Sequence, residues 1–203
     1  NINMMKKNID LERRSVDERN SDHFQELQKI LDHSMLNSEG WKSILGDVIP
    51  MEITDRKDLQ KIPITRKSDL SNLQSKIPPF GGLTTKPVNY FKNIFVSPGP
   101  IYDPGGRDDF WRMSRAMSAA GFNKGDIVYN TFSYHLTPAG EMMEQGANYI
   151  GACVIPGGIG NTEQQIQAID KLKPNRYVGT PSFLKTILEK GQESSLDVSS
   201  IKT

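Results

Sequence analysis

Apolar residues recur at helical spacing in the first part of the chain. Residues 21–36 carry an apolar stripe of the kind that faces a protein core, formed by Phe24, Leu27, Leu31 and Met35. A second, shorter helix is predicted over residues 40–48, with one apolar side made of Trp41, Ile44 and Leu45. Residues 1–16 are polar and show no clear period, so we expect them to be frayed or loosely helical.

The segment after these helices has different signals. Pro63 excludes a helix through its own position, and Thr65 is a predicted N-cap for a new helix. Lys67 and Arg66 then fall on a charged helical face, and a solvated face is favoured over a ligand-binding role for either. Residues 75–87 are rich in Pro, Gly and Thr and predict a loop.

From residue 93 onward, short apolar runs alternate with amphipathic segments. Strands are predicted at 93–96, 126–130, 153–155 and 176–178, and helices at 108–120, 138–150, 162–172 and 181–190. The stripe of the helix at 108–120 is Phe110, Met113, Met117 and Ala120. This alternation predicts an α/β fold, a parallel sheet with flanking helices, preceded by an N-terminal helical region.

Three of the predicted strands lead through a short loop into a helix start. Thr137, Asn161 and Thr180 are the predicted N-caps, with Gln164 as the capping-box partner of Asn161. Parallel strands bring such loops to one edge of the sheet, where ligands bind, and helix starts offer N–H groups to an anion. The predicted rim contains Tyr134, His135, Gly157, Gly158 and Thr180, joined by Ser97 and Tyr102. The loops before Asp126 and Arg176 should lie at the opposite end and carry no site.

Each rim residue also has a purely structural interpretation. Tyr134 offers an aromatic wall with a polar tip, and packing under the loop is an equal alternative. His135 can donate to a carboxylate or carry a proton, although satisfying a backbone carbonyl is favoured. Gly157 and Gly158 allow close backbone approach to a ligand, but plain loop glycines are the favoured interpretation. Thr180 caps a helix in either case.

Charge and cysteine content narrow the class of protein. The 203 residues have a formal net charge of +1, which gives no indication of nucleic-acid or anionic-membrane binding. The single cysteine, Cys153, lies in an apolar run and is predicted to be a small buried residue. One cysteine fits a reducing compartment, so we expect a cytoplasmic protein. His23 and His33 lack a second ligand at helical spacing, and no metal site is predicted.

Three segments resemble one known family. They are Phe132-Ser-Tyr-His-Leu-Thr-Pro-Ala-Gly140, Ile155-Pro-Gly-Gly-Ile-Gly-Asn-Thr-Glu-Gln-Gln-Ile166 and Val178-Gly-Thr-Pro-Ser-Phe-Leu184. In this order and spacing they are similar to the phenylacetate–CoA ligase family of the AMP-forming adenylating superfamily. The resemblance extends over roughly residues 59–196.

The resemblance implies a reaction and a division of the site. A carboxylate and ATP would give an acyl-adenylate, and CoA would then give the thioester, so ATP, Mg and CoA are the implied cofactors and a small aryl carboxylic acid the implied substrate. By resemblance, Tyr134, His135, Thr137 and Gly140 line the acid pocket, and Gly157 and Gly158 join them as substrate-binding candidates. The nucleotide-binding candidates are Ser97, Gly99, Tyr102 and Thr180. No catalytic residue is assigned.

Two departures from the family pattern make this a divergent branch. Where the superfamily has a Ser/Thr/Gly-rich phosphate loop, this chain keeps Ser97 and Gly99 but has neither threonine nor lysine in the loop. Pro98, Pro100 and Pro104 each remove a backbone donor, which makes a poorer phosphate cradle. Family members often have Gly-Leu-Phe at the positions of His135-Leu136-Thr137, which leaves the acid unidentified.

The family completes its nucleotide site beyond the position where this chain ends. We therefore expect residues 1–75 to form an N-terminal helical region and residues 76–203 the first part of an AMP-binding domain, inactive as a fragment. The alternative is a noncatalytic α/β module that binds a small acid or a partner chain. An unfinished sheet edge invites pairing, so a homo-oligomer is expected.

Overall fold

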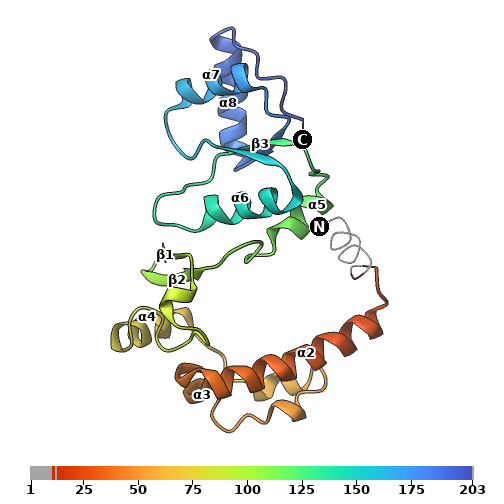
Figure 1. Cartoon of the computed structure of the whole chain (residues 1–203), viewed down its shortest axis with the longest axis vertical. Helices are drawn as coiled ribbons and strands as arrows, with labels where there is room; N and C mark the ends of the chain where they lie inside the picture. The colour runs from red at the N-terminus through yellow and green to blue at the C-terminus, as the bar shows by residue number, and fades with distance from the viewer. Residues whose placement is uncertain (1–10, 12, 203) are drawn as a thin grey trace. The chain divides into compact units, whose positions relative to one another are not determined.

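The computed structural model describes residues 11 and 13–202, which form two compact units that divide after Pro104 (Figure 1). Most of the predicted frayed segment, residues 1–16, lies outside the described residues. The division into units falls after Pro104, and the domain boundary predicted after residue 75 stays a prediction.

Two helices organise the first unit. Helix α2 (Val16–Asn37) begins with a capping box, in which Ser15 Oγ accepts from Glu18 N and the Glu18 carboxylate accepts from Ser15 N. Helix α3 (Glu39–Leu45) follows directly. The predicted apolar stripe is confirmed, because Phe24, Leu27 and Met35 pack around a buried cluster of Leu31, Leu45 and Ile53. The short 3₁₀ helices η1 (Pro50–Glu52) and η2 (Asp58–Lys61) come next.

The rest of the first unit corrects two predictions. Helix α4 (Lys67–Lys76) starts after Arg66 without a side-chain cap, so Thr65 is not its N-cap. After η3 (Val88–Tyr90), strands β1 (Asn93–Ser97) and β2 (Ile101–Gly105) form their own two-stranded sheet. Only three residues separate them, which is enough for an antiparallel turn but not for a crossover. The predicted strand at 93–96 exists, but it pairs with its neighbour along the chain and does not open the parallel sheet.

The second unit begins with a helix that is shorter than predicted. Helix α5 spans Met113–Ala119, because Asp108 and Arg112 adopt left-handed backbone conformations with φ of 58° and 59°. The carboxylate of Asp109 then accepts from Ser114 N at 3.1 Å and secures the first turn. Phe110, predicted in the buried stripe, lies before the helix and is 41% exposed.

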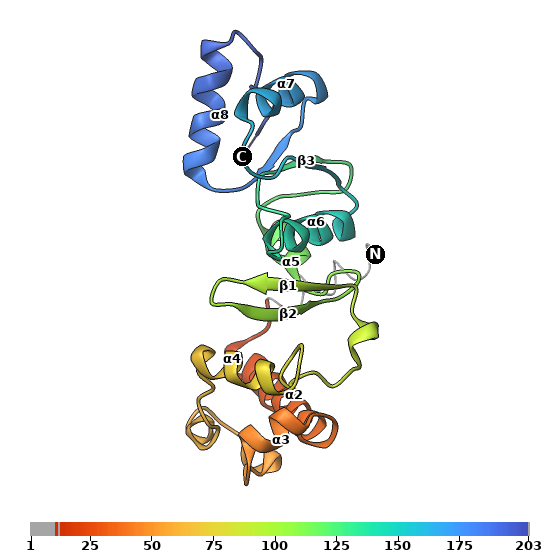
Figure 2. The ribbon, with the colours of Figure 1, turned by 90° about the vertical axis from the view of Figure 1, so that its left-hand side faces the viewer.

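A three-stranded parallel sheet confirms the predicted architecture of the second unit. Strands β3 (Ile127–Asn130), β4 (Cys153–Pro156) and β5 (Arg176–Val178) pair in the order β4-β3-β5. Helices α6 (Ala139–Ile150), α7 (Thr162–Leu172) and α8 (Pro181–Glu193) alternate with them. Figures 1 and 2 show α5 and α6 on one side of β3 and α7 and α8 on the other.

The caps of these helices agree with the sequence in two of three cases. Asn161 accepts from Gln164 N and Thr180 accepts from Phe183 N, so both are N-caps as predicted. The Gln164 side chain accepts from Asn161 Nδ2 at 2.7 Å, so it bonds the cap side chain and does not complete the predicted capping box, which uses the backbone N–H of Asn161. Helix α6 begins after Pro138 without a side-chain cap, so Thr137 is not its N-cap.

Alternation along β3 divides the core of the second unit between two faces. The Tyr129 side chain packs with Ile166 and Ile169 of α7 and Ile187 of α8. Val128 and Asn130, both buried, therefore project toward the α6 face. Cys153 is exposed, contrary to the prediction, because it starts β4, which pairs with only one strand in the described sheet. None of the described helices combines the length and apolar character needed to cross a bilayer.

Candidate functional site

The carboxyl ends of the three parallel strands lie in register. Asn130 at the end of β3 pairs with Pro156 of β4 on one side and with Val178 of β5 on the other. Two backbone hydrogen bonds continue this alignment into the loops, from Gly158 N to Asn130 O at 3.0 Å and from Thr131 N to Val178 O at 2.8 Å. The loops that carry Tyr134, Gly157, Gly158 and Thr180 therefore leave the same edge of the sheet.

Asn130 is the centre of the polar contacts at this edge. Its side chain is fully buried, and its Nδ2 donates to the Tyr134 hydroxyl and to the Gly140 carbonyl, both at 2.8 Å. Its Oδ1 accepts from Phe132 N at 3.1 Å. One amide thus joins the end of β3 to the following loop and to the first turn of α6.

The Tyr134 hydroxyl continues this network to helix α6. Burial raises the pKa of Tyr134 well above its ordinary value, and a hydrogen bond to the Glu144 carboxylate raises it further, against a smaller opposite effect of Asn130. Tyr134 is therefore a neutral phenol that accepts from Asn130 and donates to Glu144. This arrangement fixes the ring at the edge of the sheet.

Gly140 allows the Tyr134 ring to lie where it does, and Gly158 lies beside the same ring. A Cβ on Gly140 would stand 2.7 Å from Tyr134 Cδ2 and 2.8 Å from the Ser133 carbonyl oxygen, which no side chain tolerates. Gly158 has a φ of 64°, and a Cβ there would lie 4.0 Å from the same ring carbon. The first turn of α6 and the loop after β4 thus meet at the Tyr134 ring, and the structural role of Gly140 is to admit this ring.

Helix α7 fixes the loop after β4 through the side chain of Gln165. Gln165 is buried and its Nε2 donates to the carbonyl oxygens of Gly158 and Gly160, at 3.2 and 2.6 Å. Its Oε1 is buried and has no hydrogen-bond partner among the described residues. Gly157 lies against the Tyr129 ring. Burial raises the pKa of the Tyr129 hydroxyl to about 12, and the Tyr177 charge is a second cause. The glycine loop is therefore fixed by a side-chain amide and an aromatic ring.

A second hydroxyl chain links β3 to the start of α8. Thr131 Oγ1 and the Tyr177 hydroxyl are 2.9 Å apart, and the Tyr177 hydroxyl also lies 3.2 Å from the Thr180 carbonyl oxygen, to which it can donate. Thr180 itself is exposed and its Oγ1 accepts from Phe183 N at 3.3 Å. Thr180 is thus a helix cap, as predicted, with its side chain on the surface of the rim.

His135 and Thr137 stand apart from this network. The His135 ring is exposed and makes no hydrogen bond with a described residue, so it does not satisfy a backbone carbonyl. Leu136 beside it has a φ of 62° and is 58% exposed, which turns this part of the loop outward. Thr137 is half-buried, with Oγ1 at 3.5 Å from the Ser133 carbonyl oxygen.

The predicted nucleotide-binding residues Ser97, Gly99 and Tyr102 lie in the first unit, on the β1–β2 hairpin. Ser97 Oγ donates to the Asp103 carboxylate, and both backbone groups of Tyr102 bond the side-chain amide of Gln74, at 2.8 and 2.9 Å. Their place on a common rim with Tyr134 stays a prediction. Lys67 Nζ donates to the Pro98 carbonyl at 3.0 Å, so a lysine from α4 accompanies the turn that has none of its own.

The opposite end of β3 is closed by a polar cluster around Asp126. Burial raises the pKa of its carboxyl, but hydrogen bonds from Asn123 N and the Asn175 amide, together with the Arg176 guanidinium, outweigh it and hold the pKa below the ordinary value. The bonds from Asn175 and Arg176 are 2.8 and 3.0 Å long. All of these partners belong to the fold, which is consistent with a structural role.

Sequence reasoning missed four residues that organise the rim: Asn130, Glu144, Gln165 and Tyr177. Asn130 offered a signal, because an amide at the end of a buried strand must find internal partners. The other three gave none, since their roles depend on the register of the strands. In the part of the chain that the structure describes, no three His, Cys, Asp or Glu side chains are grouped as metal ligands.

Comparisons with known proteins agree with this picture. No family model matches the chain. It is 28% identical to the phenylacetate-coenzyme A ligase of Aromatoleum evansii over 92% of this chain and 44% of that protein. It is 30% identical to the phenylacetate-coenzyme A ligase of Escherichia coli strain K12 over 88% of this chain and 42% of that protein. The chain thus spans less than half the length of these relatives.

A solved structure shows the same fold. The chain superposes on 2-hydroxyisobutyryl-CoA ligase, solved with 2-HIB-AMP and CoA, with a TM-score of 0.84 and 22% identity, over 93% of this chain and 43% of that one. The comparisons confirm the resemblance to phenylacetate–CoA ligases that the sequence motifs predict.

Proposed function

We propose that this chain is the N-terminal part of a divergent AMP-forming acid–CoA ligase, in which the rim around Tyr134 holds the carboxylic acid. The observation that carries the proposal is the buried Asn130, which fixes Tyr134 and the Gly157–Gly158 loop around one point at the carboxyl edge of a parallel sheet. Ligands of open α/β sheets bind at this edge. The similarity to ligases of phenylacetate supports an acid as the ligand.

The described residues supply positioning in this proposal. The Tyr134 ring gives an apolar wall, and its hydroxyl is already committed to Asn130 and Glu144, so the ring face is the part available to the acid. Gly158, where a Cβ would meet only the Tyr134 ring at 4.0 Å, leaves room beside that wall for the ligand to approach the backbone. Gly157 packs against the Tyr129 ring, and its backbone is the part that can contact the ligand. His135, exposed on the same loop, is the group that can reach a carboxylate from solvent.

The nucleotide would be held by residues of the β1–β2 hairpin. Ser97, Gly99 and Tyr102 are the candidates there, and Lys67 supplies beside Gly99 the positive charge that the hairpin turn lacks. Thr180 is the nucleotide-binding candidate of the second unit. The proposed reaction is acid adenylation by ATP with Mg, followed by thioester formation with CoA, in a cytoplasmic enzyme. When bound, the nucleotide and CoA supply the reacting phosphoryl and thiol groups.

The test uses the longest polypeptide encoded by the gene that contains this chain. Acid-dependent pyrophosphate release from ATP, across a panel of aryl and short hydroxy acids, is expected for that polypeptide. Tyr134→Ala should raise KM for the acid by about tenfold, as expected for one lost apolar wall, and leave KM for ATP nearly unchanged. Tyr134→Phe, which keeps the ring, is the matched control. An equal loss for both substrates would contradict a role in the acid pocket.

The 203-residue chain by itself should not form an acyl-adenylate. It spans less than half of its relatives, and three prolines reduce the donors in the β1–β2 segment. The same pyrophosphate assay, with the chain at micromolar concentration, tests this expectation. Acid-dependent release above the background without acid would show it to be wrong.

We also propose that the 203-residue chain self-associates. Strands β4 and β5 each pair on one side only in the described sheet, and Cys153 is exposed on β4. Unpaired strand edges attract further strands. Light scattering under reducing conditions should give a dimer or larger species, and a monomer at about 100 μM would contradict the proposal.

A further inference from the structure

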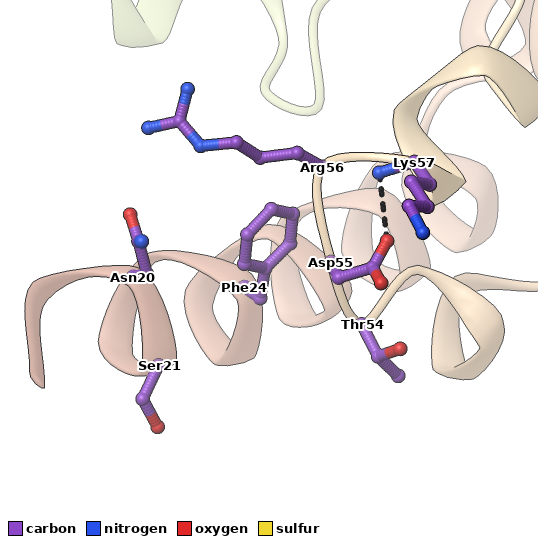
Figure 3. A pocket seen from close by; sticks show the side chains of 7 residues that line it. All are labelled: Asn20, Ser21, Phe24, Thr54, Asp55, Arg56 and Lys57. Carbon is purple, nitrogen blue, oxygen red and sulfur yellow. Dashed lines mark hydrogen bonds between the residues drawn. The ribbon is translucent and has the colours of Figure 1, made fainter. Parts of the chain in front are cut away.

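A pocket in the first unit lies outside every residue assigned above. It has a volume of about 330 Å³ and lies between helix α2 and the segment that joins η1 to η2 (Figure 3). Its lining residues are Asn20, Ser21, Phe24, Thr54, Asp55, Arg56 and Lys57. This volume is at the lower end of the range for small-molecule sites.

Two carboxylates fix the backbone of the turn that forms one side of the pocket. Asp58 accepts from Thr54 N and Thr54 Oγ1, both at 2.9 Å, and from Asp55 N at 3.2 Å. Asp55 Oδ1 accepts from Lys57 N at 2.7 Å, the dashed line in Figure 3, and from Asp58 N at 3.1 Å. Both carboxylates are thereby used within the turn, and Arg56 projects from a fixed backbone.

The two cations of this turn are Arg56 and Lys57. Among the described residues, no carboxylate pairs with the Arg56 guanidinium or the Lys57 ammonium. In contrast, Lys61 pairs with Asp58 at 2.9 Å and Lys29 with Glu26 at 2.7 Å. The pocket therefore carries two cations that are available to an anion from outside.

The other side of the pocket is aromatic. Phe24 on α2 is half-buried, packs against the Leu31, Leu45 and Ile53 cluster, and leaves part of its ring in the pocket. Figure 3 shows the Phe24 ring and the extended Arg56 side chain on the same side of α2, with the Asn20 amide nearby. A flat apolar surface next to an unpaired guanidinium suits a ligand with a ring and an acidic group.

We infer that this pocket binds a small aromatic carboxylate. Its ring lies on Phe24, in the offset or edge geometry that aromatic pairs prefer. Its carboxylate accepts from Arg56, whose planar fork matches two carboxylate oxygens, with Lys57 and the Asn20 amide as further donors. This site is additional to the proposed acid pocket, because every lining residue belongs to the first unit and Tyr134 to the second.

The experiment is a titration of the ¹⁵N-labelled 203-residue chain with benzoate, followed residue by residue by NMR. Saturable shifts are expected at the amides of Phe24, Asp55, Arg56 and Lys57, whether or not the Tyr134 loop also responds. Acetate, which lacks the ring, and benzyl alcohol, which lacks the charge, should bind at these amides about two- to fivefold more weakly than benzoate, because acetate loses the contact with Phe24 and benzyl alcohol loses the ion pair with Arg56.

Variants distinguish benzoate binding in this pocket from nonspecific binding to surface cations. Arg56→Gln should weaken benzoate by about two- to fivefold. Phe24→Leu, which keeps an apolar side chain against the cluster, should bring benzoate to the affinity of acetate. Lys42→Gln is the matched control, since Lys42 is an exposed cation on α3 away from the pocket. Amide spectra of each variant show whether the fold is kept.

Three results would overturn the inference. The first is the absence of benzoate-induced shifts around Phe24 and residues 54–57. The second is equal binding of acetate and benzoate at these amides, or an Arg56→Gln variant with unchanged affinity, since either means a charged surface only. The third is a polyglutamate peptide that shifts these amides while benzoate does not, which would make the pocket a protein-docking surface.

Discussion

Replacing Asn130 by alanine should destabilise the second unit strongly, because this one buried side chain makes three hydrogen bonds. It donates to Gly140 O and to the Tyr134 hydroxyl at 2.8 Å each, and it accepts from Phe132 N at 3.1 Å. A net contribution of about 1 kcal/mol for each bond gives a loss of about 3 kcal/mol in the free energy of unfolding. The cavity left at a fully buried position adds to this loss.

The two tryptophans of the chain make this measurement specific to one unit. Trp41 lies in the first unit and Trp111 in the second, so Trp111 fluorescence in a Trp41→Phe background follows the unfolding of the second unit in urea. The matched control is Asn148→Ala, an exposed amide on α6, which should change the free energy of unfolding by less than about 0.5 kcal/mol. A loss below about 1 kcal/mol for Asn130→Ala, or one equal to the control, would refute the reasoning.

Two further substitutions test the rest of the second unit with the same assay. Asp126→Asn should cost about 2 kcal/mol at pH 7, because the Arg176 guanidinium loses its charged partner. The Asp126 pKa is lowered in the fold, so the contribution of Asp126 to the free energy of unfolding is present above about pH 4 and is lost as the pH falls through the folded pKa. An Asp126→Asn variant whose stability falls with acid as much as that of the parent would contradict this. Gly179→Ala should cost about 2 kcal/mol or more, since its Cβ would overlap the hydroxyl oxygens of Thr131 and Tyr177, and a neutral effect would show that the loop can move away.

Helices and strands could be predicted from the sequence where local signals and tertiary packing agree. Asn161 and Thr180 cap helices in the structure because a polar cap follows a strand and precedes an amphipathic run. The predicted strand at 176–178 matches β5, and the α2 stripe faces the first core. Hydrophobic periodicity predicts such elements correctly because the side chains that set the pattern also form the core.

The failures have identifiable physical causes. The prediction for residues 108–120 followed an apolar stripe and could not see that Asp108 and Arg112 would adopt left-handed conformations, which delay the helix to Met113. Cys153 was predicted from its apolar neighbours, whereas its exposure depends on which strand lies at the edge of the sheet. The pairing of β1 with β2 could likewise not be predicted, because an alternating strand pattern does not indicate which strand will be the partner.

The two ends of β3 explain why the candidate site falls at only one of them. At the amino end, Asp126 uses its carboxylate on Asn123, Asn175 and Arg176, all of which belong to the fold. At the carboxyl end, Asn130 is equally committed, but what it fixes is a set of loops that keep exposed groups, including His135 and Thr180. A rigid support beneath exposed side chains is the arrangement that holds a ligand in a defined geometry. The internal pairing of Asn130 is therefore what makes the edge above it suitable for binding, whereas the partners of Asp126 tie the amino end of β3 to the start of β5.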